Sequence, residues 1–173
     1  MRPAPLVRPA TVADIPAITA IYRHHVLHGL ATFELDPPDA AEITRRFAEI
    51  RELGLPYLAA EIDGRIAGYA YAAVYRARPA YRYTVEDSVY VDNDHAAQGI
   101  GSALMPALIA GCAKAGRRQV VAVIGDSANL GSIRLHEKFG FKHVGLLPAV
   151  GYKFGRWVDS VLMQLAVGAG ELP

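Results

Sequence analysis

The chain has 173 residues, 52% of them hydrophobic, and its 18 basic and 17 acidic side chains leave a formal charge of +1. This length fits one domain over residues 1–173, with a core from about 5 to 167, and the composition excludes a disordered or disulfide-rich protein. The near-neutral charge argues against a nucleic-acid partner, and because no stretch reaches the roughly 18 apolar residues of a membrane span, we expect a cytoplasmic protein without a membrane partner.

Apolar residues with strand or helix periodicity, bounded by turn residues, predict the order β-α-α-β-β-β-α-β-α-β-β. The first half contains a strand over 5–9, a helix capped by Thr11 or Asp14, an extended stretch over 31–35 and a helix from 36–38 to Gly54. Three strands follow over 57–62, 66–75 and 84–91. The second half contains a helix that starts at 98–101, a strand over 120–124, a helix over 129–139, and strands over 143–150 and 158–165.

The connections between these elements predict the fold class. Asp63-Gly64 stands between two apolar runs and is a strong hairpin signal. Meandering strands followed by crossover helices indicate a sheet with helices on its faces. We therefore expect an α/β (α+β) fold, with a mixed, mostly antiparallel central sheet of six to seven strands flanked by four helices.

Two glycines lie where a strand and a loop lead into the third helix. Gly99 and Gly101 follow the strand that ends near Val91, and glycine lets a backbone approach a ligand closely. The first turn of a helix also presents free N–H groups and the positive end of its dipole, which suit a pyrophosphate. A plain turn before a helix explains the two glycines equally well, so the loop alone leaves both interpretations open.

A dinucleotide-binding (Rossmann) fingerprint is a third interpretation of this loop. That fingerprint places its first glycine directly after a first strand and an acidic residue about 20 positions later. Here the strand ends well before Gly99, and Gln119 stands at the position where the acid is expected. Geometry and the remaining chain length both argue against a Rossmann domain.

Two motifs in the right order carry a family resemblance. Gln98-Gly99-Ile100-Gly101 resembles the Q/R-x-x-G-x-G/A loop of the GNAT superfamily of N-acetyltransferases, and residues 129–141 resemble its next motif, N-x-x-A-x-x-L-Y-x-K-x-G-F. Within the superfamily the chain is similar to the phosphinothricin and methionine sulfoximine N-acetyltransferase family. This closer similarity extends over nearly the whole chain, including the segments 31–34, 83–91, 121–124, 134–137 and 151–157.

The resemblance implies acetyl-CoA as a co-substrate and no metal. In the superfamily the sheet often opens at the fourth strand, where backbone groups pair with the pantetheine amides. By this resemblance, the residues expected to hold the cofactor are Val89, Tyr90, Val91, Ala97, Gln98, Gly99, Ile100, Gly101, Ser102 and Asn129. A role as helix N-cap explains Asn129 without any cofactor.

A base is expected in the site, because acetyl transfer to an amine needs the neutral amine. Glu86 lies in the fourth strand, and strand alternation places it on one face with Ser88 and Tyr90. On a covered face, desolvation would raise the pKa of this carboxyl toward a working value. A solvated strand carboxylate is the alternative, and the resemblance implies that Glu86 is the base.

The departing thiolate also needs a proton. The superfamily often has Tyr where this sequence has His136, after Leu135. His136 is three positions from Ile133 and from Phe139, which places it near the apolar face of its helix, where a hydrogen-bonded core histidine is the alternative. The resemblance implies that His136 is part of the active site, as acid or as positioning group, and Tyr90 is a second candidate donor.

Three Arg and three Tyr crowd the segment 75–83, just before Glu86. An Arg fork binds a carboxylate or phosphinate through two hydrogen bonds, although any single Arg here is more often solvated. The resemblance makes Arg76 and Arg78 the candidates for the substrate anion. The other residues expected at the substrate are Phe33, Ala77, Glu86, Asp87 and Ser88, with Tyr152 and Lys153 as weaker candidates.

Two further features have simpler interpretations. His24 and His28 have the i,i+4 spacing of metal ligands, but no third ligand accompanies them, so we expect surface or interface residues. Cys112, the single cysteine, cannot form an internal disulfide and lies on an apolar helical stripe, which predicts a core residue.

The sequence therefore predicts an N-acetyltransferase that transfers the acetyl group of acetyl-CoA directly to a small amino acid such as phosphinothricin, methionine sulfoximine or methionine sulfone. The resemblance also implies a homodimer. Two alternatives stay open at this point. One is an acetyltransferase for another small amine or a protein N-terminus, and the other is a non-catalytic acyl-CoA sensor.

Overall fold

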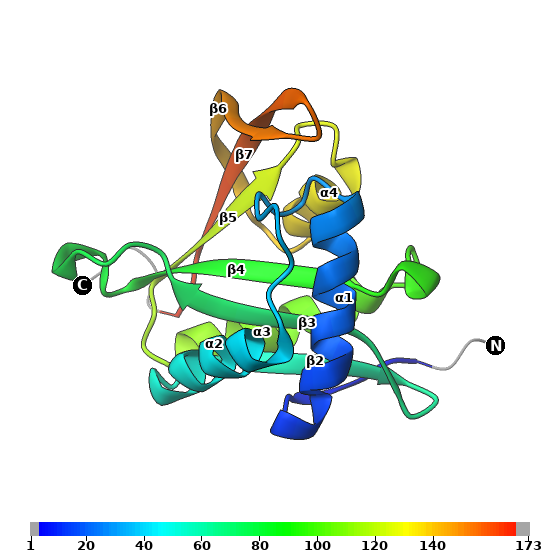
Figure 1. Cartoon of the computed structure of the whole chain (residues 1–173). Helices are drawn as coiled ribbons and strands as arrows, with labels where there is room; N and C mark the ends of the chain where they lie inside the picture. The colour runs from blue at the N-terminus through cyan, green and yellow to red at the C-terminus, as the bar shows by residue number, and fades with distance from the viewer. Residues whose placement is uncertain (1–3, 169–173) are drawn as a thin grey trace.

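The computed structural model describes residues 4–168, and its central feature is one seven-stranded sheet (Figure 1). The strand order is β1-β2-β3-β4-β5-β7-β6, and only β4 and β5 pair in parallel. The expected mixed, mostly antiparallel sheet with four helices is confirmed. The strands are β1 (Leu6–Pro9), β2 (Tyr57–Ile62), β3 (Arg65–Val74), β4 (Thr84–Val91), β5 (Gln119–Gly125), β6 (Lys142–Lys153) and β7 (Arg156–Ala166).

Helices cover both faces of this sheet, with α1 and α2 on one face and α3 and α4 on the other (Figure 1). The main helices are α1 (Ile15–His28), α2 (Ala40–Glu52), α3 (Ile100–Lys114) and α4 (Leu130–Lys138). Three short 3-10 turns are η1 (Val12–Asp14), η2 (Pro79–Tyr81) and η3 (Asn93–His95). None of the helices in residues 4–168 is both long and apolar enough to cross a bilayer.

Two hairpin turns with residues at positive φ determine where the strands on either side of them end. Asp63 and Gly64 both have positive φ and close the predicted β2–β3 hairpin. Phe154 and Gly155, also at positive φ, close a second tight hairpin. Because pairing continues up to this turn, β6 and β7 extend beyond the predicted strands 143–150 and 158–165.

The core lies on both faces of the sheet. Val26 from α1 and Leu104 and Leu108 from α3 are at most 1% exposed, as is Met163 from β7. Cys112 is fully buried on α3, which confirms the expectation of a core residue. Apolar packing on both sides therefore fixes the central strands, including β4.

The sheet opens between β4 and β5. Their parallel pairing ends at Asp87 and Ala122. Beyond this point β4 stays paired with β3 up to Val91, and β5 stays paired with β7 up to Gly125. Each strand thus follows its outer neighbour, and the inner edges of residues 88–91 and 123–125 carry backbone N–H and C=O groups without a strand partner.

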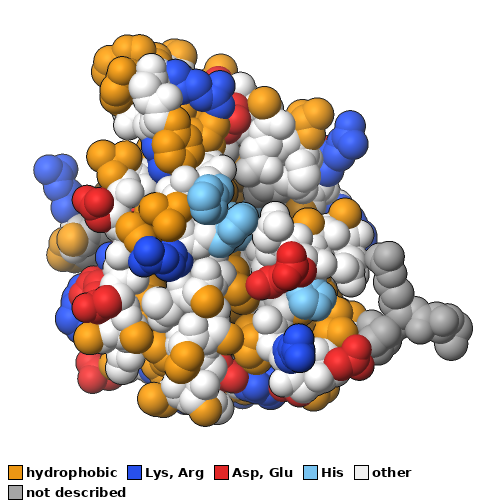
Figure 2. Space-filling view, turned by 45° about the vertical axis from the view of Figure 1, so that its right-hand side comes forward, with side chains coloured by type: hydrophobic (Ala, Val, Ile, Leu, Met, Phe, Trp, Pro, Cys, Tyr) orange, Lys and Arg blue, Asp and Glu red, His pale blue; other side chains and the backbone are white. Residues whose placement is uncertain are grey.

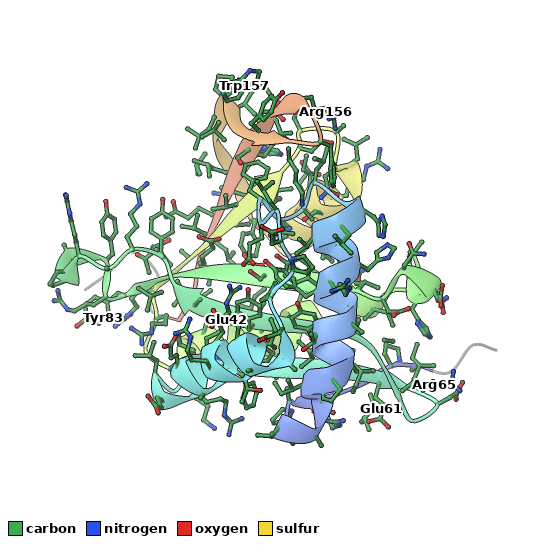
Figure 3. The ribbon with its side chains drawn as sticks, in the orientation of Figure 1. Glu42, Glu61, Arg65, Tyr83, Arg156 and Trp157 are labelled. Carbon is green, nitrogen blue, oxygen red and sulfur yellow. The ribbon has the colours of Figure 1, made fainter. Side chains whose placement is uncertain are left out.

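Arg8 ties β1 to the turn before α1. Its guanidinium donates two hydrogen bonds of 2.8 Å to Asp14, whose side chain is 7% exposed, and two more, of 3.2 Å and 3.1 Å, to Glu61. Figure 3 shows Glu61 near the β2–β3 hairpin. The hydrogen bond from Arg8 is the main reason why the pKa of Asp14 falls from 3.8 to about 2. The ionised carboxylate therefore stabilises the fold.

We predict that Asp14→Asn lowers the free energy of unfolding by on the order of 2 kcal/mol at pH 7. A carboxyl whose pKa is depressed on folding contributes stability above its unfolded pKa of 3.8 and loses it as the pH falls through about 2. The deficit should therefore shrink between pH 5 and pH 2 in urea titrations. Glu52→Gln, an exposed change on α2, is the matched control, and a deficit independent of pH would contradict this assignment.

Candidate active site

Glu86 lies in β4 on the face that α1 and α2 cover, at a cavity of about 280 Å³. Desolvation first, and the charge of the adjacent Asp87 second, raise the pKa of Glu86 to about 7. A carboxyl that is half ionised near neutral pH suits a general base. The other lining residues are Tyr22, Ala31, Thr32, Phe33, Tyr71, Ser88, Tyr90, Val123, Gly125 and Ser160.

Asp87 points to the opposite face of β4, where it meets His136 of α4. His136 Nε2 lies 3.0 Å from Asp87 Oδ2, and both side chains are at most 5% exposed. His136 Nδ1 lies 2.7 Å from the carbonyl oxygen of Ser132. Because a carbonyl oxygen only accepts, Nδ1 carries a hydrogen, and a second proton is shared between Nε2 and Oδ2.

The hydrogen bond between Asp87 and His136 holds a proton beside the opening in the sheet. Burial alone would lower the pKa of His136, but the hydrogen bond to Asp87 and its negative charge outweigh that effect and raise the pKa. Within the described part of the chain, Oδ1 of Asp87 is buried without a hydrogen-bond partner. The His136 ring packs edge-on against Phe141, with centroids 4.9 Å apart, which fixes its orientation.

The opening between β4 and β5 adjoins the cavity of Glu86, because five residues line both. Residues from both strands and from α4 line the opening, including Asp87, Val89, Asn129 and His136. An amine beside Glu86 and a group lying in the opening can therefore meet between the two strands. The residues that line both spaces are Ala31, Ser88, Tyr90, Val123 and Gly125.

Tyr90 lines both spaces but holds its proton tightly. Its side chain is 8% exposed and packs edge-on against Tyr22, with ring centroids 5.1 Å apart. Burial raises the pKa of Tyr90 well above its ordinary value. The hydroxyl is a hydrogen-bond donor at this position, but a weaker acid than an unburied tyrosine.

The two glycines in the loop before α3 are required for different reasons, one by backbone conformation and the other by close packing. Gly99 is the N-cap of α3 at φ 82°, where L-residues are strained, and Ala97 has φ 58°. A Cβ on Gly101 would lie 2.8 Å from Leu135 of α4, so the start of α3 packs closely there. The Gln98 side chain donates to the Asp94 carbonyl. The N–H groups of the first helical turn, around Ile100 and Ser102, have no acceptor inside the helix.

Side chains from α1 and α4 make hydrogen bonds around this loop and the opening of the sheet. Lys138 Nζ donates to Ser102 Oγ at 3.1 Å, which puts a cation at the start of α3. Sequence reasoning did not single out Lys138, although it stands at the Lys of the second motif. Asn129 caps α4 by accepting from the Ser132 N–H, as predicted, and the carbonyl of Val91 accepts from the His25 ring.

The predicted substrate residues divide into three groups, and one of them is Asp87 alone, which faces α4 and does not line the cavity of Glu86. Phe33 and Ser88 line the cavity of Glu86, and the sequence missed Tyr22, Tyr71 and Ser160 there because they come from distant elements. The exposed residues Arg76, Ala77 and Arg78 lie on the connection from β3 to β4, and none of them lines that cavity. Tyr83 marks the end of this connection, away from α1 (Figure 3). A substrate contact by these arginines stays a prediction.

The histidines of α1 are not arranged as a metal site. The rings of His24 and His28 have centroids 4.9 Å apart, and Figure 2 shows histidine side chains at the surface on the face that α1 presents. Within residues 4–168 no group of three or more His, Cys, Asp or Glu side chains is placed to hold a metal ion.

Comparisons with known proteins agree with this geometry. A family described as "Acetyltransferase (GNAT) domain" matches residues 7–162. The chain is 53% identical over 158 residues to a phosphinothricin N-acetyltransferase of Alcaligenes faecalis, covering 91% of this chain and 80% of the relative. It is 40% identical to an L-methionine sulfoximine/L-methionine sulfone acetyltransferase of Salmonella typhimurium, covering 96% and 97%.

A solved structure is also similar over nearly the whole length. The phosphinothricin acetyltransferase of Sinorhizobium meliloti, crystallised with acetyl-CoA, superposes with a TM-score of 0.93 at 45% identity. The match covers 96% of this chain and 90% of that one. The similarity therefore includes all the elements that form the opening and the cavity.

We predict that Glu86→Gln stabilises the protein at alkaline pH. A carboxyl whose pKa is raised on folding contributes stability below its unfolded pKa of 4.5 and loses it as the pH rises through about 7. Removing the charge should therefore raise the free energy of unfolding by on the order of 1–3 kcal/mol at pH 8.5, and change it little at pH 4.5. If the substitution changed the free energy of unfolding by the same amount at both pH values, Glu86 would be solvated.

Proposed function

We propose that this chain, which belongs to the GNAT family of acetyltransferases, uses Glu86 to deprotonate the amino group of a small amino acid. The chain is an acetyl-CoA-dependent N-acetyltransferase of the phosphinothricin and methionine sulfoximine type. The observation that carries the proposal is a desolvated carboxyl, with a pKa of about 7, in a cavity that shares lining residues with the opening of the sheet.

The reaction needs the amine in its neutral form, because an ammonium has no lone pair for the thioester carbonyl. At neutral pH, Glu86 is partly ionised and can accept this proton, directly or through a water molecule. The amine then forms the new C–N bond, and the C–S bond breaks. The second proton that the nitrogen loses passes through water and replaces the proton given to the thiolate. The cavity walls hold the acceptor near the opening, so that the two reactants meet in a fixed orientation.

The leaving thiolate takes a proton, for which the shared proton of the Asp87–His136 pair is the proposed source. The pair is supported by its position at the opening, by its buried hydrogen bond and by the hydrogen bond from His136 to Ser132. Transfer of this proton leaves a neutral His136 beside an ionised Asp87. Tyr90 is the second candidate, although burial makes its hydroxyl less acidic.

Acetyl-CoA fits the opening and the loop before α3. The free strand edges offer donors and acceptors for the pantetheine amides, and Val89, Val91 and Asn129 belong to this region. Residues 97–102 supply the first turn of α3 for the pyrophosphate, with Lys138 as an added cation.

The proposed acceptor is phosphinothricin, methionine sulfoximine or methionine sulfone, the compounds in the names of the relatives. Arg76 and Arg78 remain the proposed partners of the second polar head, because their exposed guanidinium groups are available as bidentate forks. The proposed location is the cytoplasm. Named enzymes among the close relatives leave no support for a non-catalytic sensor.

We predict that Glu86→Gln lowers kcat/KM by about 100-fold or more at pH 7 without weakening acetyl-CoA binding. The wild-type rate should rise with pH through a midpoint near 7, because only the ionised carboxylate accepts the proton. In the variant this limb should be absent, and the deficit should shrink only at higher pH, where the amine loses its proton without a base. Thiol release measured with methionine sulfone checks this, with Glu137→Gln on the exposed face of α4 as control. Near-normal turnover of Glu86→Gln at pH 7 would refute the base assignment.

We also propose a homodimer, with the β6–β7 hairpin at the interface. β6 is an edge strand, and residues 142–150 are exposed throughout. Hydrophobic side chains gather at the top of the molecule, where this hairpin lies (Figure 2), and Trp157 there is 67% exposed (Figure 3). A second copy would cover these apolar side chains and the free edge of the strand.

Light scattering at micromolar concentration should therefore give twice the mass of one chain. Trp157→Glu should shift the mass to that of a single chain, because an interface buries charge poorly. Leu35→Glu, an equally exposed apolar position in the α1–α2 connection, is the control and should leave the mass unchanged. A single-chain mass for the wild-type protein would refute the homodimer.

A further inference from the structure

Residues 30–34, between α1 and α2, cross the site as a strap. Thr32 and Phe33 line the cavity of Glu86, and Ala31 lines both this cavity and the opening between β4 and β5. The strap has neither helix nor strand structure, so its position depends on contacts with other elements. These contacts decide the shape of the cavity roof.

Two glycines allow the strap to lie against the sheet. A Cβ on Gly125, the last residue of β5, would stand 2.1 Å from the carbonyl oxygen of Leu30. A Cβ on Gly151, in β6, would stand 2.4 Å from the ring of Phe33. Side chains cannot approach this closely, so both positions require glycine while the strap is seated.

Lys153 provides a third contact from the end of β6. Its side chain is buried, and Nζ donates a 2.7 Å hydrogen bond to the carbonyl oxygen of Thr32. Within residues 4–168 no carboxylate forms an ion pair with this ammonium, and Glu34 of the strap is paired with Arg46 instead. Desolvation accordingly lowers the pKa of Lys153. An unpaired buried ammonium costs stability, so stability alone does not explain this residue.

We propose that Lys153 is a positioning residue that holds the strap, and thereby Phe33, in place as the roof of the acceptor pocket. This inference rests on the proposed function of the Glu86 cavity as the amine site. Lys153 does not itself line the cavity, and it acts through the backbone of Thr32, which does. Because Lys153 belongs to the β6–β7 hairpin, the same contact connects the hairpin to the pocket.

The first test is Lys153→Met, which keeps the length of the side chain and removes its charge and donor. We expect KM for the amino acid to rise about 10- to 100-fold, as for a lost hydrogen bond to a charged group. KM for acetyl-CoA and the pH midpoint of the rate should not change, and Tm should stay equal or rise. Lys142→Met, at the exposed start of the same strand, is the control and should change neither KM.

The second test moves the strap without changing Lys153. In Gly151→Ala the added methyl displaces the Phe33 ring, so KM for the amino acid should rise. In a Phe33→Ala background the same substitution should have no further effect, because the ring is absent. Hydrogen exchange of residues 30–34, measured without substrates, should be faster in Lys153→Met than in the wild type.

A parallel rise of both KM values together with a lower Tm would overturn the proposal and assign Lys153 to the fold alone. Unchanged KM values, or unchanged exchange of residues 30–34 in Lys153→Met, would also overturn it. If the wild-type protein transferred no acetyl group, the proposed function would fail. The exchange measurement would still decide separately whether Lys153 anchors the strap.

Discussion

The separation of β4 from β5 is the constraint on which the site depends. After Asp87 and Ala122 the two strands stay with their outer neighbours, and the packing on both faces of the sheet prevents them from closing the gap. A gap in the middle of a sheet leaves backbone groups without strand partners, which costs stability unless a ligand or water satisfies them. In the proposed function, the same gap is where the thioester of acetyl-CoA reaches an amine on the other face of the sheet.

Strand alternation explains how one short segment supplies two opposed chemical groups. Glu86 faces α1 and α2 in a tyrosine-lined cavity, where desolvation favours its protonated form. Asp87 faces α4, where His136 keeps its carboxyl in a buried hydrogen bond. Two neighbouring carboxyl groups thus lie in different environments, and the opening of the sheet lies beside both. In the proposed mechanism, proton acceptance and proton donation therefore lie on separate sides of the same strand.

Local sequence predicts the elements better than it predicts the site. Asp63-Gly64 fixes a hairpin by its own conformational preferences, and the alternation of residues 84–91 gives β4 with the observed ends. Phe154 is not a typical turn residue, so the strands predicted for the β6–β7 hairpin are shorter than those observed. Asp87 and His136 are 49 positions apart, and no local pattern indicates that their side chains meet. The strap contacts of Gly125, Gly151 and Lys153 likewise depend on tertiary packing, which a periodicity argument does not contain.

Hydrogen exchange with and without acetyl-CoA tests the central claim most directly, because the amides at the open edge exchange unless a ligand occupies them. If the opening and the glycine loop bind the cofactor, saturating acetyl-CoA should slow exchange of residues 88–91 and 99–102, in wild type and in Glu86→Gln alike. The core strand β2 should change little. Cofactor binding without protection of either segment would contradict the account and place acetyl-CoA elsewhere on the molecule.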